Sequence, residues 1–494
     1  MHLSRTKRAW AFWALIVLGL YNGCAGHVEC RESGKWLDAG GWTIGPTLAV
    51  RALRALGTDD GDLQRYHAYA NAVLGLPYQA TFIRPIEGWK VDTRAVDDAR
   101  DGADPETVPP VVPAKPLVPY RDFLVEYPPG FFFFAIPVAL VARSIDGYAD
   151  AFSIFMGLLL TAALALAWDV AKRLTPGREG GAERRASLIS FSAMCALAVG
   201  PIIVRRYDAV ISFAICLLVW GCVSKRAWAA GLGFGIGVAA KGMPLLLGPV
   251  VLGYLLVAGR RREAVTATLV AIGVVAVAVV PFLGPAGGHL LDIFAYHGQR
   301  PLQVESTGGS LLVFSRFFSP DSVVATQTYG SMNVVSAWAK PLEALASFLP
   351  LAAVVSVAAL SIRDLARAPA ADETARGQIL VRGACTTLAF VMVLGKVFSP
   401  QYLTWLLPLG VLASLATDRR FARWTFLGAL LLTQVIWPLC YSIKLAANLN
   451  PFFGALVLAR NGLLFAWAWQ LASPLRAQRA TGALSTPSRS VASA

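Results

Sequence analysis

The chain has 494 residues, of which 56% are hydrophobic and 15% are charged. A soluble domain is typically about 45–50% apolar and about 25% charged, so this composition excludes an ordinary soluble enzyme and a disordered chain. Lys and Arg total 44 and Asp and Glu total 30, which leaves a formal charge of +14. That excess would suggest nucleic-acid binding in a soluble protein. Here the basic residues lie between long apolar blocks, so the sequence predicts a polytopic membrane protein without a nucleic-acid partner.

Apolar runs of about 17–22 residues, the length that crosses the hydrocarbon core of a bilayer, recur along the chain. The stretch Trp228–Ala258 is about twice that length, and Lys241 and Pro244 interrupt it, so we predict two crossings that meet near Lys241. The short run Phe131–Val141 is predicted to be re-entrant or interfacial. The fold class is therefore all-α and polytopic, with about twelve transmembrane helices. The remaining predicted spans are 9–26, 149–170, 187–204, 208–223, 264–283, 341–362, 379–395, 402–417, 424–441 and 452–472.

The orientation follows from Lys and Arg in the short loops, which favour the cytoplasm. The basic clusters can all be cytoplasmic if 131–170 crosses the membrane once, and both termini then lie in the cytoplasm. We interpret 1–26 as a retained anchor helix, because it lacks the small-x-small site of a cleaved signal peptide, and 473–494 as a cytoplasmic tail. These clusters are Arg5, Lys7 and Arg8; Lys172, Arg173, Arg178, Arg184 and Arg185; Lys225 and Arg226; Arg260, Arg261 and Arg262; Arg419, Arg420 and Arg423; Arg476 and Arg479.

Two long extracytoplasmic loops result, at 27–128 and 284–340, separated by central helices at 129–283 and followed by C-terminal helices at 341–472. The first loop carries 11 basic and 15 acidic residues, so it does not share the basic character of the chain. It contains a predicted helix from Asp62 to Leu74. The proline-rich tract Val108–Pro119 is then predicted to be an extended spacer. A long outer loop beside short cytoplasmic turns usually carries the function.

The unusual polar residues all lie at the outer ends of spans or in the outer loops. Charges this close to the bilayer are expensive and are functional candidates by default. Their convergence predicts a single outward-facing polar site at the membrane surface. The candidates are Asp62; Asp122 and Glu126; Arg205, Arg206 and Asp208; Lys241; His297, Arg300 and Glu305; Lys396, Gln401 and Tyr402.

Several of these residues also fit a structural role. Asp62 fits a helix N-cap in a solvated turn, and the Asp60-x-Asp62 spacing also fits a divalent cation site. Arg205 and Arg206 fit an anchor in lipid headgroups, and His297 fits an ordinary loop histidine. The pair Arg460-Asn461 lies inside the last span and requires a buried partner or a headgroup, which the sequence does not identify.

Four glycines, at 231, 233, 235 and 237, superficially suggest a nucleotide-binding loop. That motif requires a preceding strand and the start of a helix. These glycines lie inside an apolar span, where small residues allow close packing between helices. The sequence therefore predicts a packing role for them.

The residue types of the outer face suit transfer of a sugar from a lipid phosphate. No nucleotide sugar or ATP is supplied outside the cytoplasm, so the donor must arrive in the membrane. A carboxylate base activates the acceptor hydroxyl, and cations hold the departing phosphate. Arginine offers bidentate phosphate contacts and lysine offers a point charge.

Six motifs in a fixed order carry a family resemblance, over roughly residues 60 to 470. Together they resemble glycosyltransferase family 87, bacterial type C membrane glycosyltransferases that include polyprenyl-phosphate-mannose-dependent mannosyltransferases. The motifs are Asp62–Ala70, Pro119–Gly130, Arg206–Asp208, Lys241–Pro244, Tyr296–Ser306 and Phe398–Pro408.

The resemblance implies inverting transfer of a sugar, often mannose, from a polyprenyl phosphate to an extracytoplasmic lipid or glycan acceptor, in a bacterial cytoplasmic membrane. Asp62 matches the acidic residue that serves as base in the superfamily. His297 matches a histidine that contacts the donor phosphate or handles a proton, and Asp122 is the second candidate for the base. By the physical argument, the phosphate contacts are Arg205, Arg206, Lys241, Arg300 and Lys396, and Glu126, Asp208, Glu305, Gln401 and Tyr402 line the site.

One departure and two alternatives remain. In relatives we expect the helix after the acidic residue to run directly into the Pro-Tyr-Arg-Asp-Phe motif, but Ala80–Val118 separates them here and is expected to reshape acceptor binding. A transporter or flippase for lipid-linked sugars is a second class, although we find one broken span and no counterpart in the other half. A polysaccharide polymerase or ligase acting on diphosphate-linked oligosaccharides is a third. The sequence predicts no certain cofactor and leaves one alternative open, a divalent cation.

Overall fold

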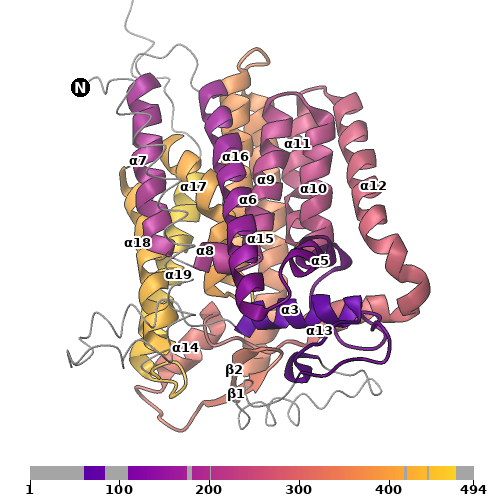
Figure 1. Cartoon of the computed structure of the whole chain (residues 1–494). Coiled ribbons are helices and arrows are strands. Elements are labelled where there is room, and N and C mark those ends of the chain that lie inside the picture. The colour runs from indigo at the N-terminus through magenta and orange to yellow at the C-terminus, as the bar shows by residue number, and fades with distance from the viewer. Residues whose placement is uncertain are drawn as a thin grey trace, which may run out of the picture.

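The computed structural model describes residues 61–83, 110–174, 181–200, 202–416, 420–441 and 444–473. The predicted anchor at 1–26, much of the first outer loop and the tail beyond 473 lie outside these residues. Long helices stand side by side in one bundle (Figure 1). Shorter elements lie across one end of it, among them α3 (Gly61–Leu74), α13 (Asp292–Gln299) and α14 (Thr307–Ser315).

Within the described residues, five helical segments are long and apolar enough to cross a membrane, and further apolar helices are shorter. The protein is therefore a multi-pass helical membrane protein, while a count of about twelve crossings stays a prediction. The bundle helices are α6 (Ile145–Arg173), α7 (Gly181–Val199), α8 (Ile202–Arg205), α9 (Asp208–Val223), α10 (Ala227–Lys241), α11 (Gly248–Val257), α12 (Arg261–Ala286), α15 (Ala339–Arg367), α16 (Glu373–Leu394), α17 (Leu403–Ala416), α18 (Arg420–Gln434) and α19 (Pro451–Ala472).

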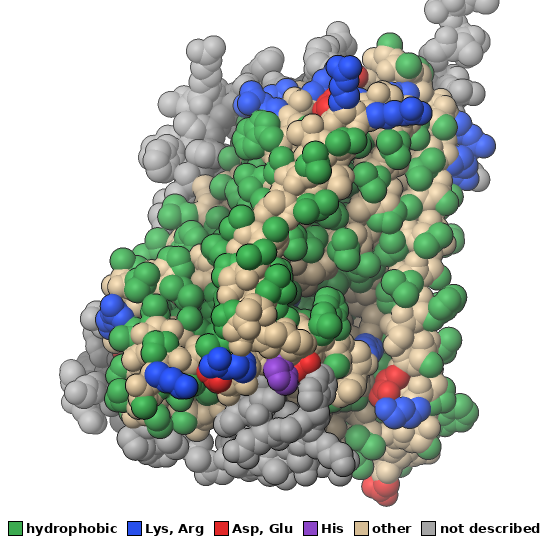
Figure 2. Space-filling view, turned by 90° about the vertical axis from the view of Figure 1, so that its right-hand side faces the viewer, with side chains coloured by type: hydrophobic (Ala, Val, Ile, Leu, Met, Phe, Trp, Pro, Cys, Tyr) green, Lys and Arg blue, Asp and Glu red, His purple; other side chains and the backbone are tan. Residues whose placement is uncertain are grey.

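On the face shown in Figure 2, charged side chains gather at the two ends of the bundle and hydrophobic side chains cover much of the surface between them. At one end, the turn that follows α11 meets the end of α9, since Arg260 donates to the carbonyl of Cys222 at 2.9 Å. The turn after α9 also reaches the start of α16, where Lys225 pairs with Glu373. These turns carry basic clusters that the sequence assigns to the cytoplasm. The elements that carry Asp62 and His297 lie at the opposite end.

The break predicted near Lys241 is present. α10 ends at Lys241 because Gly242 adopts a φ of +73°, and the 3-10 turn η4 (Met243–Leu247) separates it from α11. The short run after the first loop forms η3 (Pro129–Phe131) and α5 (Phe132–Val141). With 10 residues, α5 is about 15 Å long, half of a hydrocarbon core of about 30 Å. That this run is re-entrant or interfacial stays a prediction.

The glycine-rich stretch of α10 packs between α9 and α12, as the sequence predicts. A Cβ at Gly231 would lie 2.3 Å from the carbonyl oxygen of Ala267 on α12, and Gly235 faces the same helix. A Cβ at Gly233 would lie 2.5 Å from the carbonyl oxygen of Ala214 on α9. Glycines therefore bring the backbones of three helices together.

The flanks of the interposed segment return to α3. Tyr78 and Val111 exchange backbone hydrogen bonds of 3.0 and 2.9 Å, and the N–H of Leu117 donates to the carbonyl of Ala72 at 2.9 Å. Residues 110–119 form no helix, in agreement with the predicted spacer. Because the segment leaves and rejoins at one place, the chain on either side of it stays adjacent.

The all-α prediction is wrong for one part of the second outer loop. There β1 (Val324–Thr328) and β2 (Ser331–Val335) form an antiparallel hairpin. Its two turn residues, Tyr329 and Gly330, have φ angles of +55° and +64°, the signs of the type I′ turn that matches strand twist. Alternating β-branched residues around Tyr-Gly are the sequence signal for this hairpin.

The packing of α10 makes a prediction about its glycines. Gly233→Ala is expected to lower the free energy of unfolding by about 1–3 kcal/mol, because the new methyl group overpacks the contact with α9. Gly273→Ala on α12 is the matched control, since a Cβ there meets nothing within 4 Å. The control is expected to be neutral or stabilising by up to about 1 kcal/mol. Equal melting temperatures of the two variants in detergent would contradict the prediction.

Candidate active site

The first residues of α3 meet buried cations. Asp62 lies in the first turn of the helix, and its Oδ2 is 3.2 Å from Nε of Arg206. Its Oδ1 is 3.7 Å from Nη2 of Arg65, one turn along α3. Arg206 is 4% exposed, at the junction between α8 and α9. The Asp62 carboxylate therefore lies between two guanidinium groups.

Glu126 connects the two outer loops. Its carboxylate forms an ion pair with Arg65 and lies 3.4 Å from the hydroxyl of Tyr296 on α13. Its backbone carbonyl lies 3.0 Å from Nε2 of His297. Because a carbonyl oxygen only accepts, Nε2 carries the proton, and Nδ1 of the neutral ring is an acceptor. Tyr296 and His297 therefore both contact Glu126, although they follow it by 170 and 171 positions in the chain.

A second ion pair lies deeper, between Asp208 and Lys241. Their Oδ1 and Nζ atoms are 2.7 Å apart, and Asp208 is 1% exposed. The indole N–H of Trp405 donates to the same oxygen at 2.5 Å. Lys241 also lies 5.0 Å from the ring centroid of Tyr402. Asp208 begins α9 and Lys241 ends α10, so each charge also has the sign that its helix dipole favours.

An aromatic layer supports these charges. The ring of Tyr127 stacks on Phe131 at 4.7 Å, and Tyr66 of α3 lies 5.7 Å from Tyr127. A Cβ at Gly130 would lie 2.5 Å from the carbonyl oxygen of Ala239. The Tyr-Pro-Pro-Gly motif therefore rests directly on the last turn of α10, which ends at Lys241.

Two more cations lie beside these groups, Arg300 in the second outer loop and Lys396 after α16. Arg300 donates to the hydroxyl of Ser331 at 3.0 Å, and Lys396 donates to the carbonyl of Gly298 at 2.6 Å. Desolvation lowers the pKa of Lys396, and the positive charge of Arg300 also lowers it. The hairpin turn completes this side, because the hydroxyl of Tyr296 donates to the carbonyl of Tyr329 at 2.8 Å.

Some predicted site residues lie elsewhere. Asp122 sits in a tight local turn, where its carboxylate accepts from Arg121 at 2.8 Å and from the N–H of Val118 at 2.7 Å. The hydrogen bond from Arg121 lowers the pKa of Asp122. Among the described residues, no ion pair or hydrogen bond joins it to Asp62.

Glu305 is not part of this surface. It is 1% exposed and pairs with Arg460 of α19 at 3.2 Å, with the hydroxyl of Tyr441 donating to it at 2.7 Å. Arg205 is buried next to Arg206. Gln401 is half-buried beside Tyr402, and its side chain makes no hydrogen bond within the described part of the chain.

Sequence reasoning did not single out Arg65, Tyr296 and Trp405. All three lie within the motifs that carried the family resemblance, and Arg65 follows Asp62 at the i, i+3 spacing that places both on one helix face. Within the described residues, no group of three or more His, Cys, Asp or Glu side chains could hold a metal ion. Asp60 of the predicted Asp60-x-Asp62 site lies outside them.

A model of glycosyltransferase family 87 matches residues 123–390, more than half of the chain. The chain belongs to this family. The match confirms the resemblance drawn from the motifs, and the protein is a glycosyltransferase. The matched region includes Glu126, Arg206, Asp208, Lys241 and His297. No curated protein and no solved structure matches the chain.

The buried pair makes a prediction about stability in this glycosyltransferase. Lys241→Met leaves the Asp208 carboxylate buried without its cation, so the free energy of unfolding is expected to fall by about 3–5 kcal/mol. Adding Asp208→Asn removes the stranded charge and is expected to restore most of that loss. Thermal unfolding in detergent measures both variants. A double variant no more stable than Lys241→Met would contradict the assignment.

Proposed function

We propose that the protein transfers mannose from a polyprenyl-phosphate donor to an extracytoplasmic lipid or glycan acceptor, with inversion at the anomeric carbon. The observation that carries the proposal is the meeting of carboxylates and cations from both outer loops at the end of the bundle opposite the basic turns. In the proposed orientation those turns face the cytoplasm of a bacterial cell, following the distribution of Lys and Arg. Both termini are then cytoplasmic.

The cations of the site suit the donor phosphate. Arg206 pairs with Asp62 and Lys241 pairs with Asp208, whereas Arg300 and Lys396 bind neutral oxygens of Ser331 and Gly298. Within the part of the chain that the structure describes, Arg300 and Lys396 form no ion pair with a carboxylate, so their charge is available to a phosphate. In the proposed reaction this charge stabilises the phosphate as it leaves. The polyprenyl tail stays in the bilayer while the phosphate binds at headgroup level.

Asp62 is the proposed base. Its side chain is 21% exposed, whereas that of Asp208 is 1% exposed, so an acceptor hydroxyl can reach Asp62. The carboxylate takes the hydroxyl proton as the acceptor oxygen bonds to the anomeric carbon. The bond from that carbon to the phosphate oxygen breaks on the opposite face, and the phosphate leaves with its electron pair. Arg65 and Arg206 hold the base in place, and His297 is proposed to contact the phosphate.

The central test replaces the proposed base Asp62 and a control carboxylate in purified protein. Asp62→Asn is expected to lower kcat by about 10²–10⁴-fold, the usual contribution of a general base. Asp146→Asn is the matched control, since Asp146 is exposed in the first turn of α6. Transfer from polyprenyl-phosphate mannose to cell-envelope lipids is measured in detergent, and NMR of the product gives the anomeric configuration.

Three outcomes would contradict parts of this proposal. Wild-type turnover in Asp62→Asn would remove that residue from the role of base, and loss of transfer in Asp122→Asn alone would assign the role to Asp122. Retention of configuration would contradict inversion. Flipping of the lipid in vesicles without sugar transfer would favour a flippase, and preference for a diphosphate-linked oligosaccharide would favour a polymerase or ligase.

A further inference from the structure

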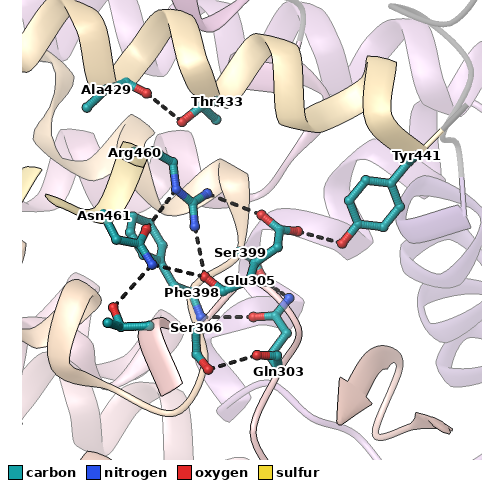
Figure 3. Close-up of polar contacts among 11 residues, drawn as sticks. Gln303, Glu305, Ser306, Phe398, Ser399, Ala429, Thr433, Tyr441, Arg460 and Asn461 are labelled. Carbon is teal, nitrogen blue, oxygen red and sulfur yellow. Dashed lines mark hydrogen bonds and ion pairs between the residues drawn. The ribbon is translucent and has the colours of Figure 1, made fainter. Parts of the chain in front are cut away.

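A second polar cluster lies inside the bundle, at Arg460 of α19 (Figure 3). Arg460 is 0% exposed, and its guanidinium group both pairs with the Glu305 carboxylate at 3.2 Å and donates to the Glu305 carbonyl at 2.9 Å. It also lies 4.0 Å from the ring centroid of Phe398. One side chain of the last helix therefore holds both the side chain and the backbone of Glu305.

The neighbouring Asn461 extends the cluster to α16. Its amide donates to the Glu305 carbonyl at 3.3 Å and to the hydroxyl of Thr307 at 3.1 Å. That hydroxyl donates in turn to the carbonyl of Val393 near the end of α16, at 2.5 Å. The start of α14 is thus held between α16 and α19.

Two residues before Glu305, Gln303 joins two segments of the outer face. Its backbone N–H donates to the carbonyl of Lys396 at 3.0 Å. Its side-chain oxygen accepts from the N–H of Phe398 at 2.8 Å, and its amide donates to the hydroxyl of Ser399 at 3.2 Å. Gln303 is 5% exposed, so these contacts are shielded from water. Gln303 therefore fixes the position of the segment that comes after α16 (Figure 3).

The two fixed segments carry two of the proposed phosphate-binding cations. Lys396 belongs to one of them, and its ammonium group binds the carbonyl of Gly298, next to Arg300. Tyr402 and Trp405, which contact Lys241, follow a few residues later. A displacement at Gln303 would therefore move phosphate-binding groups on both segments.

A buried ion pair is weak evidence for stability, because apolar residues of similar volume often replace it without loss. What the Arg460 cluster supplies is direction, since a planar guanidinium group binds a carboxylate and a carbonyl in fixed geometry. We propose that Arg460 is a positioning residue. It holds Glu305 and, through Gln303, keeps Lys396 and Arg300 in place around the donor phosphate. This inference rests on the proposed function, because the phosphate role of those cations is part of it.

The test separates positioning from stability in the full-length protein. Arg460→Met strands the Glu305 charge, so the informative variant is the double change Glu305→Gln and Arg460→Met, which removes both charges together. We expect its melting temperature to return toward the wild-type value while kcat/KM for polyprenyl-phosphate mannose stays about 100-fold low, mainly through a higher KM. Amide hydrogen exchange in residues 396–403 is expected to be faster.

Arg382→Met is the matched control. Arg382 is also a buried arginine that binds α19, donating to the carbonyls of Leu471 at 2.6 Å and Ser473 at 2.9 Å, at the end of the bundle away from the site. This control is expected to lower the melting temperature without changing the KM for the donor. A comparable rise in KM in the control would overturn the proposal, because any buried arginine would then have that effect.

Two results bear directly on the proposal. Recovery of both melting temperature and kcat/KM in the double variant would overturn it and leave a purely structural ion pair. If the double variant does not fold, Gln303→Met decides, since it removes the contacts with Phe398 and Ser399 without stranding a charge. A raised KM with faster exchange at 396–403 supports the proposal, and wild-type values of both overturn it.

Lys396→Met separates this inference from the proposed function. An unchanged donor KM in that variant would contradict the phosphate role of Lys396. Faster exchange at 396–403 in the Glu305→Gln and Arg460→Met variant would still support positioning of the segment by Arg460. The failure of one proposal is therefore distinguishable from the failure of the other.

Discussion

The ion pair between Lys241 and Asp208 sets where the helices of this protein must end. An uncompensated charge at this depth costs several kcal/mol, so the last turn of α10 and the first turn of α9 have to meet at the same level. The glycines of α10 allow that meeting, because they let its backbone approach both α9 and α12. Gly130 then rests on the same turn and places Glu126 between the outer loops. The surface at this end of the bundle is thus built upward from one buried contact.

The charges of the site are largely paired before any substrate arrives. Arg206 holds Asp62, and Arg65 lies between Asp62 and Glu126. Such pairs fix the direction of each group, so little reorganisation is required when charge moves during the reaction. In the proposed transfer, Arg206 lies beside the base and belongs to the phosphate-binding set. Deprotonation of the acceptor and departure of the phosphate would then change the field at the same guanidinium group.

Apolar blocks predicted the helices, and the break at Lys241, because chain length across a bilayer is a strong constraint. The order of the predicted spans placed Asp62, His297 and Lys241 at one end for the same reason. The sequence did not show which polar residues are buried. Glu305 resembles a surface acid, yet it is the buried partner that Arg460 requires. The sequence did not identify this pair because 155 positions separate the two residues. Asp122 lies in a motif typical of the family, but in the structure its carboxylate binds Arg121 and Val118 within a local turn. The hairpin was missed because two short strands are a weak signal beside long apolar helices.

The pairing of Tyr78 with Val111 has a consequence for how this enzyme can vary. The excursion between them departs from and returns to a single point on the scaffold, so its length is decoupled from the distance between Asp62 and Glu126. Insertions and deletions at this point can accumulate or be engineered without moving the charged groups. It is a suitable place to graft a tag or a new recognition module onto this end of the bundle.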